Sequence, residues 1–198
     1  MQRLLIVYAT REGHTHRVAR YLLEAFQVRG IFVEISNAAQ VRTDLELGAY
    51  GAVVLAGSVH MGAYERELVR FAAQHRSELE CMPSALISVS MSEAVLQSTS
   101  TTRRQREEAK LRIEAALAGF RKETGWNPGR TLSVPGALMY RSYGRMMRFI
   151  MRTIARSNGT PTDVSRDHVL TDWPALTRFA ADFAGTLEKP APAAVPAA

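Results

Sequence analysis

Short apolar runs alternate with longer amphipathic segments along this chain, and the two patterns predict different elements. Five apolar runs bounded by turn residues predict β-strands, over residues 3–8, 31–35, 52–57, 84–89 and 131–135. All but the second are rich in valine, isoleucine and leucine without polar alternation, which is typical of strands buried on both faces. The second run is shorter and mixed, which favours an edge position.

Helical periodicity fills most of the intervals between these runs. Val18, Leu22 and Phe26 recur at helical spacing within residues 15–29, and Gly30 stands where such a helix would end. Similar patterns predict helices over residues 63–76, 102–122 and 173–187. This alternation predicts an α/β fold, a doubly wound parallel sheet of five strands with helices on both faces.

Composition limits the class of protein. A chain of 198 residues with 46% hydrophobic content is long enough for one well-cored domain, which we expect over residues 1–187. Residues 188–198 are rich in alanine and proline without core formers, which predicts a disordered tail. No apolar run is long enough for a membrane span, and the amino-terminal segment lacks the pattern of a secretory signal.

Cysteine and histidine usage gives no sign of a metal site. The single cysteine, Cys81, can form neither an intrachain disulfide nor a cysteine-based metal cluster, which fits a reducing cytoplasm. We expect it to be a small buried residue at the entrance to the fourth strand. The five histidines show no ligand spacing, so no metal is predicted.

The turn between the first strand and the first helix carries the most specific chemistry. Its residues are Thr10, Arg11, Glu12, Gly13, His14 and Thr15. Unpaired backbone N–H groups and the helix dipole favour an anion at such a helix start, and the hydroxyls add donors. A phosphate monoester fits this cradle. The alternative is that one threonine simply caps the helix. The motifs of nucleoside triphosphatases and dinucleotide folds are absent.

Two further loops are expected to meet this turn, because ligands of doubly wound sheets bind beyond the carboxyl ends of the strands. The predicted cofactor-binding residues of these loops are Ser58, Val59, His60, Met61, Gly62 and Tyr64 after the third strand, and Ser88, Val89, Ser90 and Met91 after the fourth. Tyr64, His60 and Met61 can lie against a flat ring. The alternative is a plain connection with a packed tyrosine.

The first turn resembles a known family. Ile6-Val7-Tyr8, then Thr10, Gly13, Thr15, Ala19 and Leu22 resemble the flavodoxin signature. The resemblance implies a flavodoxin-like sheet with its five strands in the order 2-1-3-4-5. It also implies FMN as cofactor, with its phosphate held by hydroxyls and amides of the turn. Flavin chemistry belongs to the cofactor, so no side chain is assigned as acid or base.

Later segments resemble a narrower family, the FMN-dependent protoporphyrinogen dehydrogenases linked to quinones. The matching segments are Met82-Pro83-Ser84-Ala85, Gly125-Trp126-Asn127-Pro128-Gly129-Arg130, Gly136-Ala137-Leu138-Met139-Tyr140 and Thr171-Asp172-Trp173. The resemblance implies oxidation of protoporphyrinogen IX to protoporphyrin IX in haem biosynthesis, with a membrane quinone as acceptor. Two departures stand out: His60 and Met61 replace a basic residue and an aromatic, and residues 88–106 do not match the family's long substrate-side loop closely.

Positive charge is concentrated near the carboxyl-terminal third. The net charge is +6, and residues 139–166 contain six arginines against one acid, Asp163. Arg141, Arg145, Arg148, Arg152 and Arg156 are spaced to share one stripe of a helix, with Met147, Ile150, Met151 and Ile154 on the other side. Such a helix suits an anionic membrane surface or the carboxylates of a tetrapyrrole. The alternative is a solvated arginine face over an apolar side packed on the sheet.

Several functions remain open on the sequence. Arg141, Arg145, Arg148 and Arg152 are predicted to contact substrate or membrane, which would place the protein in the cytoplasm at the inner face of the cell membrane. A flavodoxin-type electron carrier is one alternative, although carriers of that type tend to be acidic. An FMN-dependent quinone or NAD(P)H reductase is another. Nucleic acid binding is not favoured, because the basic segment lacks interleaved aromatics.

Overall fold

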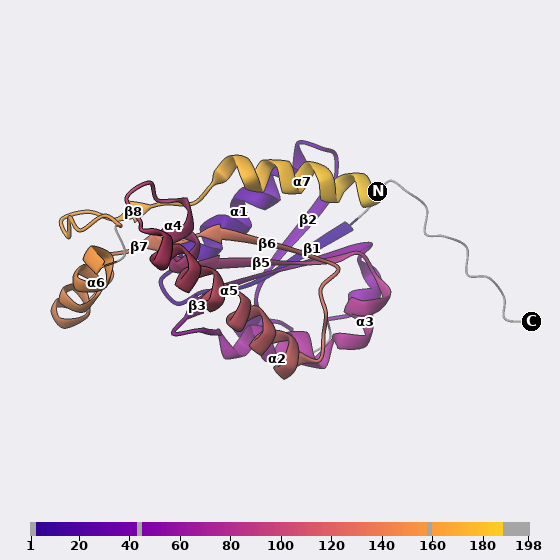
Figure 1. The fold of residues 1–198 in the computed structure, drawn as a ribbon. Helices are drawn as coiled ribbons and strands as arrows, with labels where there is room; N and C mark the ends of the chain where they lie inside the picture. The colour runs from indigo at the N-terminus through magenta and orange to yellow at the C-terminus, as the bar shows by residue number, and fades with distance from the viewer. Residues whose placement is uncertain (1–2, 43–44, 158–159, 188–198) are drawn as a thin grey trace, which may run out of the picture.

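A five-stranded parallel sheet organises the computed structural model, which describes residues 3–42, 45–157 and 160–187 (Figure 1). Its strands are β1 (Arg3–Ala9), β2 (Phe32–Asn37), β3 (Ala52–His60), β5 (Ser84–Ser90) and β6 (Arg130–Pro135). Their order, β2-β1-β3-β5-β6, confirms the predicted order 2-1-3-4-5 and places the second strand at an edge. The predicted tail lies outside the described residues.

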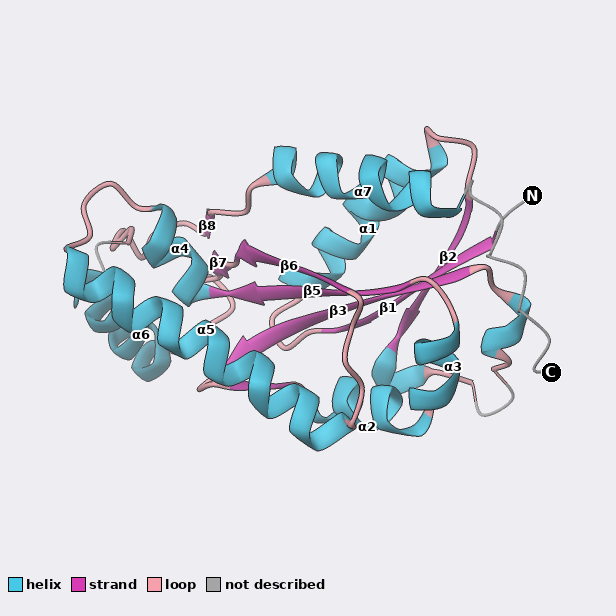
Figure 2. Cartoon of the chain, turned by 45° about the vertical axis from the view of Figure 1, so that its right-hand side comes forward, coloured by secondary structure: helices cyan, strands magenta, loops and turns pink. Residues whose placement is uncertain are grey.

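Helices cover both faces of this sheet. Helices α1 (His14–Gln27) and α7 (Trp173–Leu187) cover one face; α2 (Arg66–Gln74), α3 (Arg76–Cys81) and α5 (Arg103–Thr124) lie on the other (Figures 1 and 2). Successive strand residues serve opposite cores, so that Val54 packs with the α1 side and Val53 with the α2 side. Strands buried on both faces cannot show polar alternation, which explains the continuous apolar runs.

The connection after β3 differs from the predicted helix over residues 63–76. Residues Ala63–Tyr64 form a short strand, β4, antiparallel to the end of β3. The turn between them contains Met61 and Gly62 at positive φ of 52° and 83°, a backbone typical of tight hairpins. The helix therefore begins only at Arg66, and a break at His75 separates α2 from α3.

Other short elements were not predicted. Helix α4 (Met91–Gln97) follows β5 directly, capped by the Ser90 hydroxyl, which accepts a hydrogen bond from the backbone N–H of Glu93 at 3.2 Å. Two 3₁₀ turns, η1 (Ala38–Gln40) and η2 (Leu47–Ala49), join β2 to β3. Cys81 is exposed, not buried as expected, because the last turn of α3 directs it to solvent.

A separate lobe is inserted between β6 and α7. It consists of β7 (Ala137–Leu138), α6 (Arg145–Ser157) and β8 (His168–Val169), and β7 pairs antiparallel with β8. Figure 2 shows this insertion at the carboxyl ends of β5 and β6, next to α4 and the start of α5. Among the described residues, no helix has the length and apolar content needed to cross a membrane.

Candidate cofactor site

The turn after β1 forms an open helix start suited to an anion. Gly13 occupies the cap position of α1 with φ of 84°, and no side chain caps the helix. The Thr10 hydroxyl instead accepts a hydrogen bond from the backbone N–H of Gly13 at 3.0 Å, which closes the turn. A Cβ added at Gly13 would meet nothing within 4 Å, so the approach to the N–H groups is open. The positive φ favours glycine here, as only glycine adopts it without strain.

Two buried hydroxyls lie near this helix start. Thr15 sits in the first turn of α1 and is almost fully buried. The Ser58 hydroxyl at the end of β3 is buried without a hydrogen-bond partner among the described groups. A Cβ at Gly57 would strike Leu68 on the α2 side, so the neighbouring Ser58 faces the α1 side of the sheet. A buried hydroxyl without a partner requires a bound group or water to satisfy it.

His14 turns inward from the same turn. Its Nε2 lies 2.7 Å from the hydroxyl of Thr171, at the entrance to α7. Burial lowers the pKa of His14 to about 4, with a further contribution from the charge of Arg17. The imidazole is therefore neutral at pH 7, and His14 can contribute to an anion site only through its backbone N–H. Thr171 belongs to a segment that resembles the narrower family, but its contact with His14 was not predicted from the sequence.

A cluster of charges joins the turn to the β3–β4 hairpin. His60 Nε2 lies 3.3 Å from a carboxylate oxygen of Glu12 and 3.6 Å from one of Glu65, and Arg11 pairs with Glu65 at 3.4 Å. Burial acts to raise the pKa of Glu12, but the hydrogen bond and charge of His60, with Arg11, lower it below its ordinary value. Sequence reasoning identified Arg11, Glu12 and His60 but missed Glu65, whose position beyond the loop gave no signal.

Tyr64 does not form the wall that its sequence position suggested. Its ring is buried against Phe120, with centroids 4.7 Å apart, and its hydroxyl donates to Ser88 at 2.8 Å. Burial raises the pKa of Tyr64 to about 12, although the bond to Ser88 opposes this shift. The ring points into the core because β4 pairs with β3 and turns this side chain over Gly57. The alternative of a packed tyrosine therefore describes it.

The remaining predicted residues gather at the same edge of the sheet. Ser58 is in register with Val89, and Ser90 with Pro135, so the ends of β3, β5 and β6 lie side by side. Ser88, Val89 and Ser90 are buried, while Met61 at the hairpin tip is fully exposed. Val59 packs against the α2-side core, Gly62 completes the hairpin turn and Met91 begins α4 beside the insertion. Of the three side chains predicted to lie against a ring, Met61 is exposed, His60 is half-buried and Tyr64 is buried.

The predicted arginine stripe is only partly present. Arg145, Arg152 and Arg156 are exposed on α6, but Arg141 precedes the helix, in a turn where its backbone N–H donates to Asp167 at 2.8 Å. Arg148 donates to the carbonyls of Tyr140 at 3.0 Å and Tyr143 at 3.3 Å, so it joins α6 to the segment that precedes it within the insertion. Two of its nitrogens are thus occupied within the insertion, and contact of Arg148 with substrate or membrane stays a prediction.

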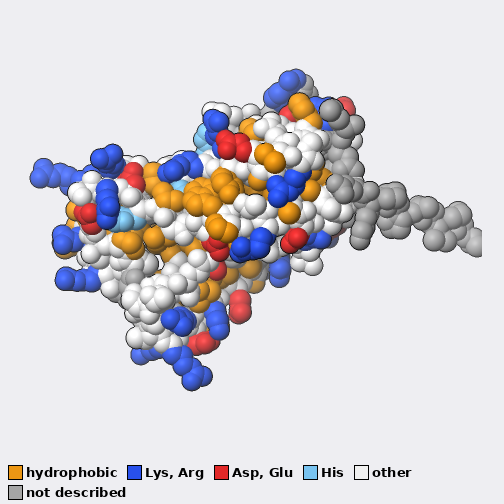
Figure 3. All heavy atoms as spheres, turned by 90° about the horizontal axis from the view of Figure 1, so that it is seen from above, with side chains coloured by type: hydrophobic (Ala, Val, Ile, Leu, Met, Phe, Trp, Pro, Cys, Tyr) orange, Lys and Arg blue, Asp and Glu red, His pale blue; other side chains and the backbone are white. Residues whose placement is uncertain are grey.

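The apolar side of α6 is exposed rather than packed on the sheet. Met146 and Phe149 are 76% and 72% exposed. Met147, Ile150 and Ile154 are 40–46% exposed, and of the apolar residues of α6 only Met151 and Ala155 pack on the insertion's own small core. Figure 3 shows lysine and arginine side chains projecting around the end of the molecule that carries α6, with hydrophobic atoms between them. This arrangement removes the alternative of an apolar side buried on the sheet.

Comparison with known proteins identifies the fold family of this site. A family model described as flavodoxin domain matches residues 5–165. The chain belongs to the flavodoxin domain family. Solved structures agree in fold at 15% identity: a short-chain flavodoxin associated with a bacterial microcompartment (TM-score 0.53, covering 95% of this chain and 100% of that chain) and rubredoxin oxygen:oxidoreductase from Desulfovibrio gigas (TM-score 0.56, 95% and 36%).

Curated relatives of this flavodoxin-family protein carry a more specific name. A protein of Escherichia coli K12 is 28% identical over 186 residues, covering 94% of this chain and 97% of the relative. One of Leishmania major is 31% identical over 184 residues, covering 91% and 74%. Both are named protoporphyrinogen IX dehydrogenase (quinone).

FMN is the cofactor to which this family membership points, and the residues present fit it. The open start of α1, with no acidic residue in its first turn, suits the phosphate. The unsatisfied Ser58 hydroxyl offers a donor beside it. Among the described residues no cluster of histidine, cysteine or carboxylate side chains has the arrangement of a metal site.

Proposed function

We propose that this protein is an FMN-dependent dehydrogenase that oxidises protoporphyrinogen IX to protoporphyrin IX and passes the electrons to a membrane quinone. Haem biosynthesis is the pathway that uses this reaction. The observation that carries the proposal is the open phosphate turn, Gly13 with its neighbours, in a chain that aligns over nearly its full length with dehydrogenases of that name.

Bound FMN would supply the two-electron chemistry, and the protein would hold and surround it. We infer that the N–H groups following Gly13, with Thr10, Thr15 and Ser58, hold the phosphate. Met61 and His60 would border the ring, with His60 held between Glu12 and Glu65. Because His60 and Met61 replace a basic residue and an aromatic of the family pattern, the ring contacts here would be a thioether and an imidazole in place of that pair.

The direct test is an anaerobic assay with protoporphyrinogen IX and a soluble quinone, followed by porphyrin fluorescence. We expect porphyrin formation that depends on both FMN and the quinone, and FMN in the supernatant after denaturation. A protein that binds FMN but forms no porphyrin would overturn the dehydrogenase. Reduction of quinone by NADPH in that protein would favour a reductase, whereas reduction only by a partner flavoprotein would favour an electron carrier.

We further propose that α6 holds the protein at an anionic lipid surface on the cytoplasmic face of the cell membrane, where the quinone is dissolved. Exposed Met146, Phe149 and Ile150 supply apolar surface, and Arg145, Arg152 and Arg156 supply charge on the adjoining flank. Apolar area combined with attraction to anionic lipid is what binds an interfacial helix, and each basic residue contributes about 1 kcal/mol. The exposed apolar side of α6 is more favourably placed against the apolar part of a lipid surface than against water.

Flotation with vesicles of anionic lipid tests this assignment. We expect the wild-type protein to float and the double variant Arg145→Glu with Arg152→Glu to remain in the lower fraction. The matched control is Arg104→Glu with Arg112→Glu, which makes the same change of net charge on exposed positions of α5. Equal flotation of both variants would remove α6 as the lipid contact.

A further inference from the structure

A cavity of about 480 Å³ lies at the corner between α4 and α5, outside the predicted cofactor loops. Its lining combines one apolar side chain, Leu96, with a hydroxyl, three cationic side chains and one carboxylate; the polar members are Thr101, Arg103, Arg106, Glu107 and Lys110. Cations therefore outnumber acids in the lining. We call this cavity the α4–α5 corner.

One guanidinium of the corner is held in place. Arg106 donates from Nε to the Thr101 hydroxyl at 3.1 Å and from Nη2 to the Ser98 carbonyl at 3.2 Å. Thr101 is itself buried and donates to the Val95 carbonyl at 3.0 Å. These bonds fix the turn from α4 to α5 and, with it, the direction of the guanidinium. A fixed guanidinium loses little freedom when it binds an anion.

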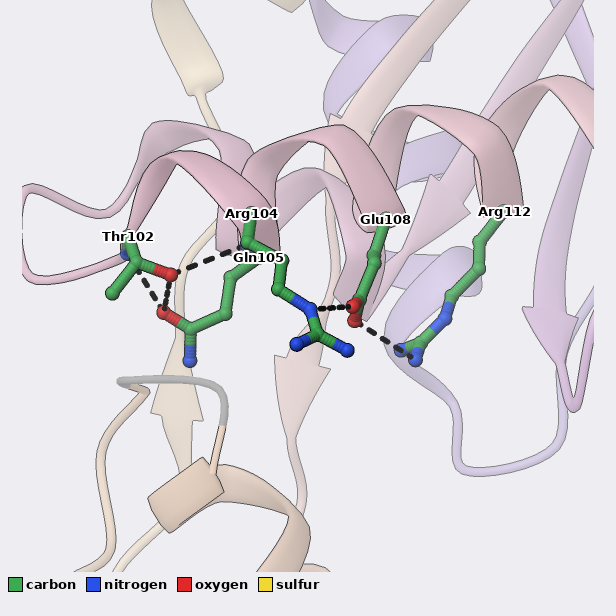
Figure 4. A network of polar contacts seen from close by, with 5 residues as sticks. All are labelled: Thr102, Arg104, Gln105, Glu108 and Arg112. Carbon is green, nitrogen blue, oxygen red and sulfur yellow. Dashed lines mark hydrogen bonds and ion pairs between the residues drawn. The ribbon is translucent and has the colours of Figure 1, made fainter.

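A second guanidinium is available for an incoming anion. The ion pairs of α5 join Arg104 and Arg112 to Glu108, as Figure 4 shows, and Lys110 to Glu107 at 3.3 Å. Arg103 takes no part in them, although it lines the corner. The only carboxylate of the lining is thus opposed by Lys110, which leaves the charges of Arg103 and Arg106 in excess. Guanidinium groups match the geometry of a carboxylate better than any other side chain.

The corner lies at the same end of the sheet as the cofactor loops. Helix α4 starts immediately after Ser90, the last residue of β5, and contacts both β6 and α5. At about 1.5 Å per residue, Leu96 lies roughly 8 Å along the helix from its start. Figures 1 and 2 both place α4 beside the carboxyl ends of β5 and β6. A substrate that reaches from the end of β5 along α4 would contact the corner as well.

We propose that the α4–α5 corner binds a carboxylate of the tetrapyrrole substrate, with Arg103 and Arg106 as its partners and Leu96 against the adjoining apolar part. This inference rests on the proposed function, since a porphyrinogen is an apolar macrocycle that carries carboxylates at its edge. It divides the two roles suggested for the arginines of α6. The α4–α5 corner binds the carboxylate of the substrate, and α6 contacts lipid.

The test compares Arg103→Glu with Arg104→Glu, two equal charge changes on neighbouring residues of which only the first lines the corner. Holoprotein is titrated with protoporphyrin IX and with its dimethyl ester, and KM for protoporphyrinogen IX is measured anaerobically. We expect wild-type protein to prefer the free acid. In Arg103→Glu this preference disappears and KM rises about tenfold or more, the effect of losing one charge-assisted hydrogen bond, while FMN affinity and kcat are retained.

Arg104→Glu should behave like the wild-type protein. An unchanged KM and acid preference in Arg103→Glu, in a wild-type background that does oxidise the substrate, overturns the corner alone. If wild-type protein forms no porphyrin, the proposed function fails, and the titrations decide the corner separately. Loss of acid preference in Arg103→Glu only would then support a carboxylate site, and equal binding of acid and ester would overturn it.

Discussion

His14 connects the cofactor turn to the end of β6, which is distant in the sequence, through a chain of buried polar atoms. Thr171 donates its only hydroxyl proton to the Pro135 carbonyl at 2.9 Å, so it must accept from His14. The proton of His14 therefore lies on Nε2, and its Nδ1 is buried without a partner. This link fixes the start of α1 against the end of β6. Burial keeps the imidazole neutral in the folded protein at pH 7.

We expect His14 to make the apoprotein less stable in acid. Its folded pKa of about 4 lies below the ordinary value of 6.5. Above pH 6.5 both folded and unfolded states hold it neutral, and it has no effect on the pH dependence. Between these two pH values the unfolded state binds a proton at His14 and the folded state does not. The free energy of unfolding therefore falls as the pH decreases, and this fall levels off below about pH 4.

Urea unfolding of the apoprotein at pH 7.5 and pH 5 measures this effect. The control is His14→Gln, whose amide nitrogen can replace Nε2 as donor to Thr171 but does not titrate. Its unfolding midpoint should change less between the two pH values than that of the wild-type protein. An equal change in both proteins would contradict the assignment.

At the scale of single residues, the sequence predicted the place of a residue in a turn or helix better than the direction of its side chain. Thr10, Gly13 and Thr15 lie where the signature placed them, because turn and helix start follow from local chemistry. Tyr64 was misjudged because its direction depends on pairing between β3 and β4, a strand of two residues with no periodicity. Glu65 contacts Arg11 and Thr171 contacts His14, and both pairs are distant in the sequence. A local sequence pattern cannot predict such contacts.

Helix α6 illustrates the same limit for an element. The spacing of arginine and apolar residues predicted a helix, and one begins at Arg145. The spacing did not predict which side would pack: the buried side runs through Arg148, Met151 and Ala155, between the arginine and apolar flanks. Arg148 can occupy this side because the carbonyls of Tyr140 and Tyr143 accept its hydrogen bonds. A charged residue thus became part of the packing.

We expect Arg148→Ala to loosen the insertion, whereas Arg152→Ala leaves it folded. Arg148 supplies two hydrogen bonds from a charged donor, each worth roughly 1.5–3 kcal/mol, and Arg152 is exposed. Hydrogen exchange of residues 139–167 provides the measurement. Amide protection there should drop in Arg148→Ala and stay unchanged in Arg152→Ala, with the sheet protected in both. Equal protection of the insertion in both variants would contradict the role of Arg148.

For the molecule as a whole, the parallel sheet followed from the alternation of strands and helices, since parallel strands require crossover connections. Its strand order followed from the resemblance to flavodoxins. The insertion was not foreseen as a lobe, because β7 and β8 have two residues each. Residues 88–98 were expected to form a loop, but α4 occupies most of them, and the helix predicted over residues 102–122 follows as α5. Serine and threonine residues of this region act as caps and turn bonds, through Ser90, Thr101 and Thr102.

Cofactor binding should stabilise the entire domain, because the proposed FMN site joins β1, β3 and β5. FMN at a hundredfold excess over Kd should raise the free energy of unfolding by about 2.7 kcal/mol. For a chain of this size that raises Tm by roughly 2–4 °C per kcal/mol. Thermal scans with FMN and riboflavin at equal concentration measure it. A smaller shift with riboflavin is expected, and equal shifts would contradict a phosphate site at Gly13.

The pairing of β7 with β8 brings the chain back to the place it left. Ala137 is in register with Val169, the Leu170 N–H donates to the Gly136 carbonyl at 3.2 Å, and Thr171 is bonded to Pro135. Both ends of the insertion are therefore clamped next to each other at the rim of the sheet. Evolution can lengthen, shorten or recharge the segment between these clamps without displacing the flavin loops. The surface that this segment presents can thus change while the sheet rim beside the predicted cofactor loops stays fixed.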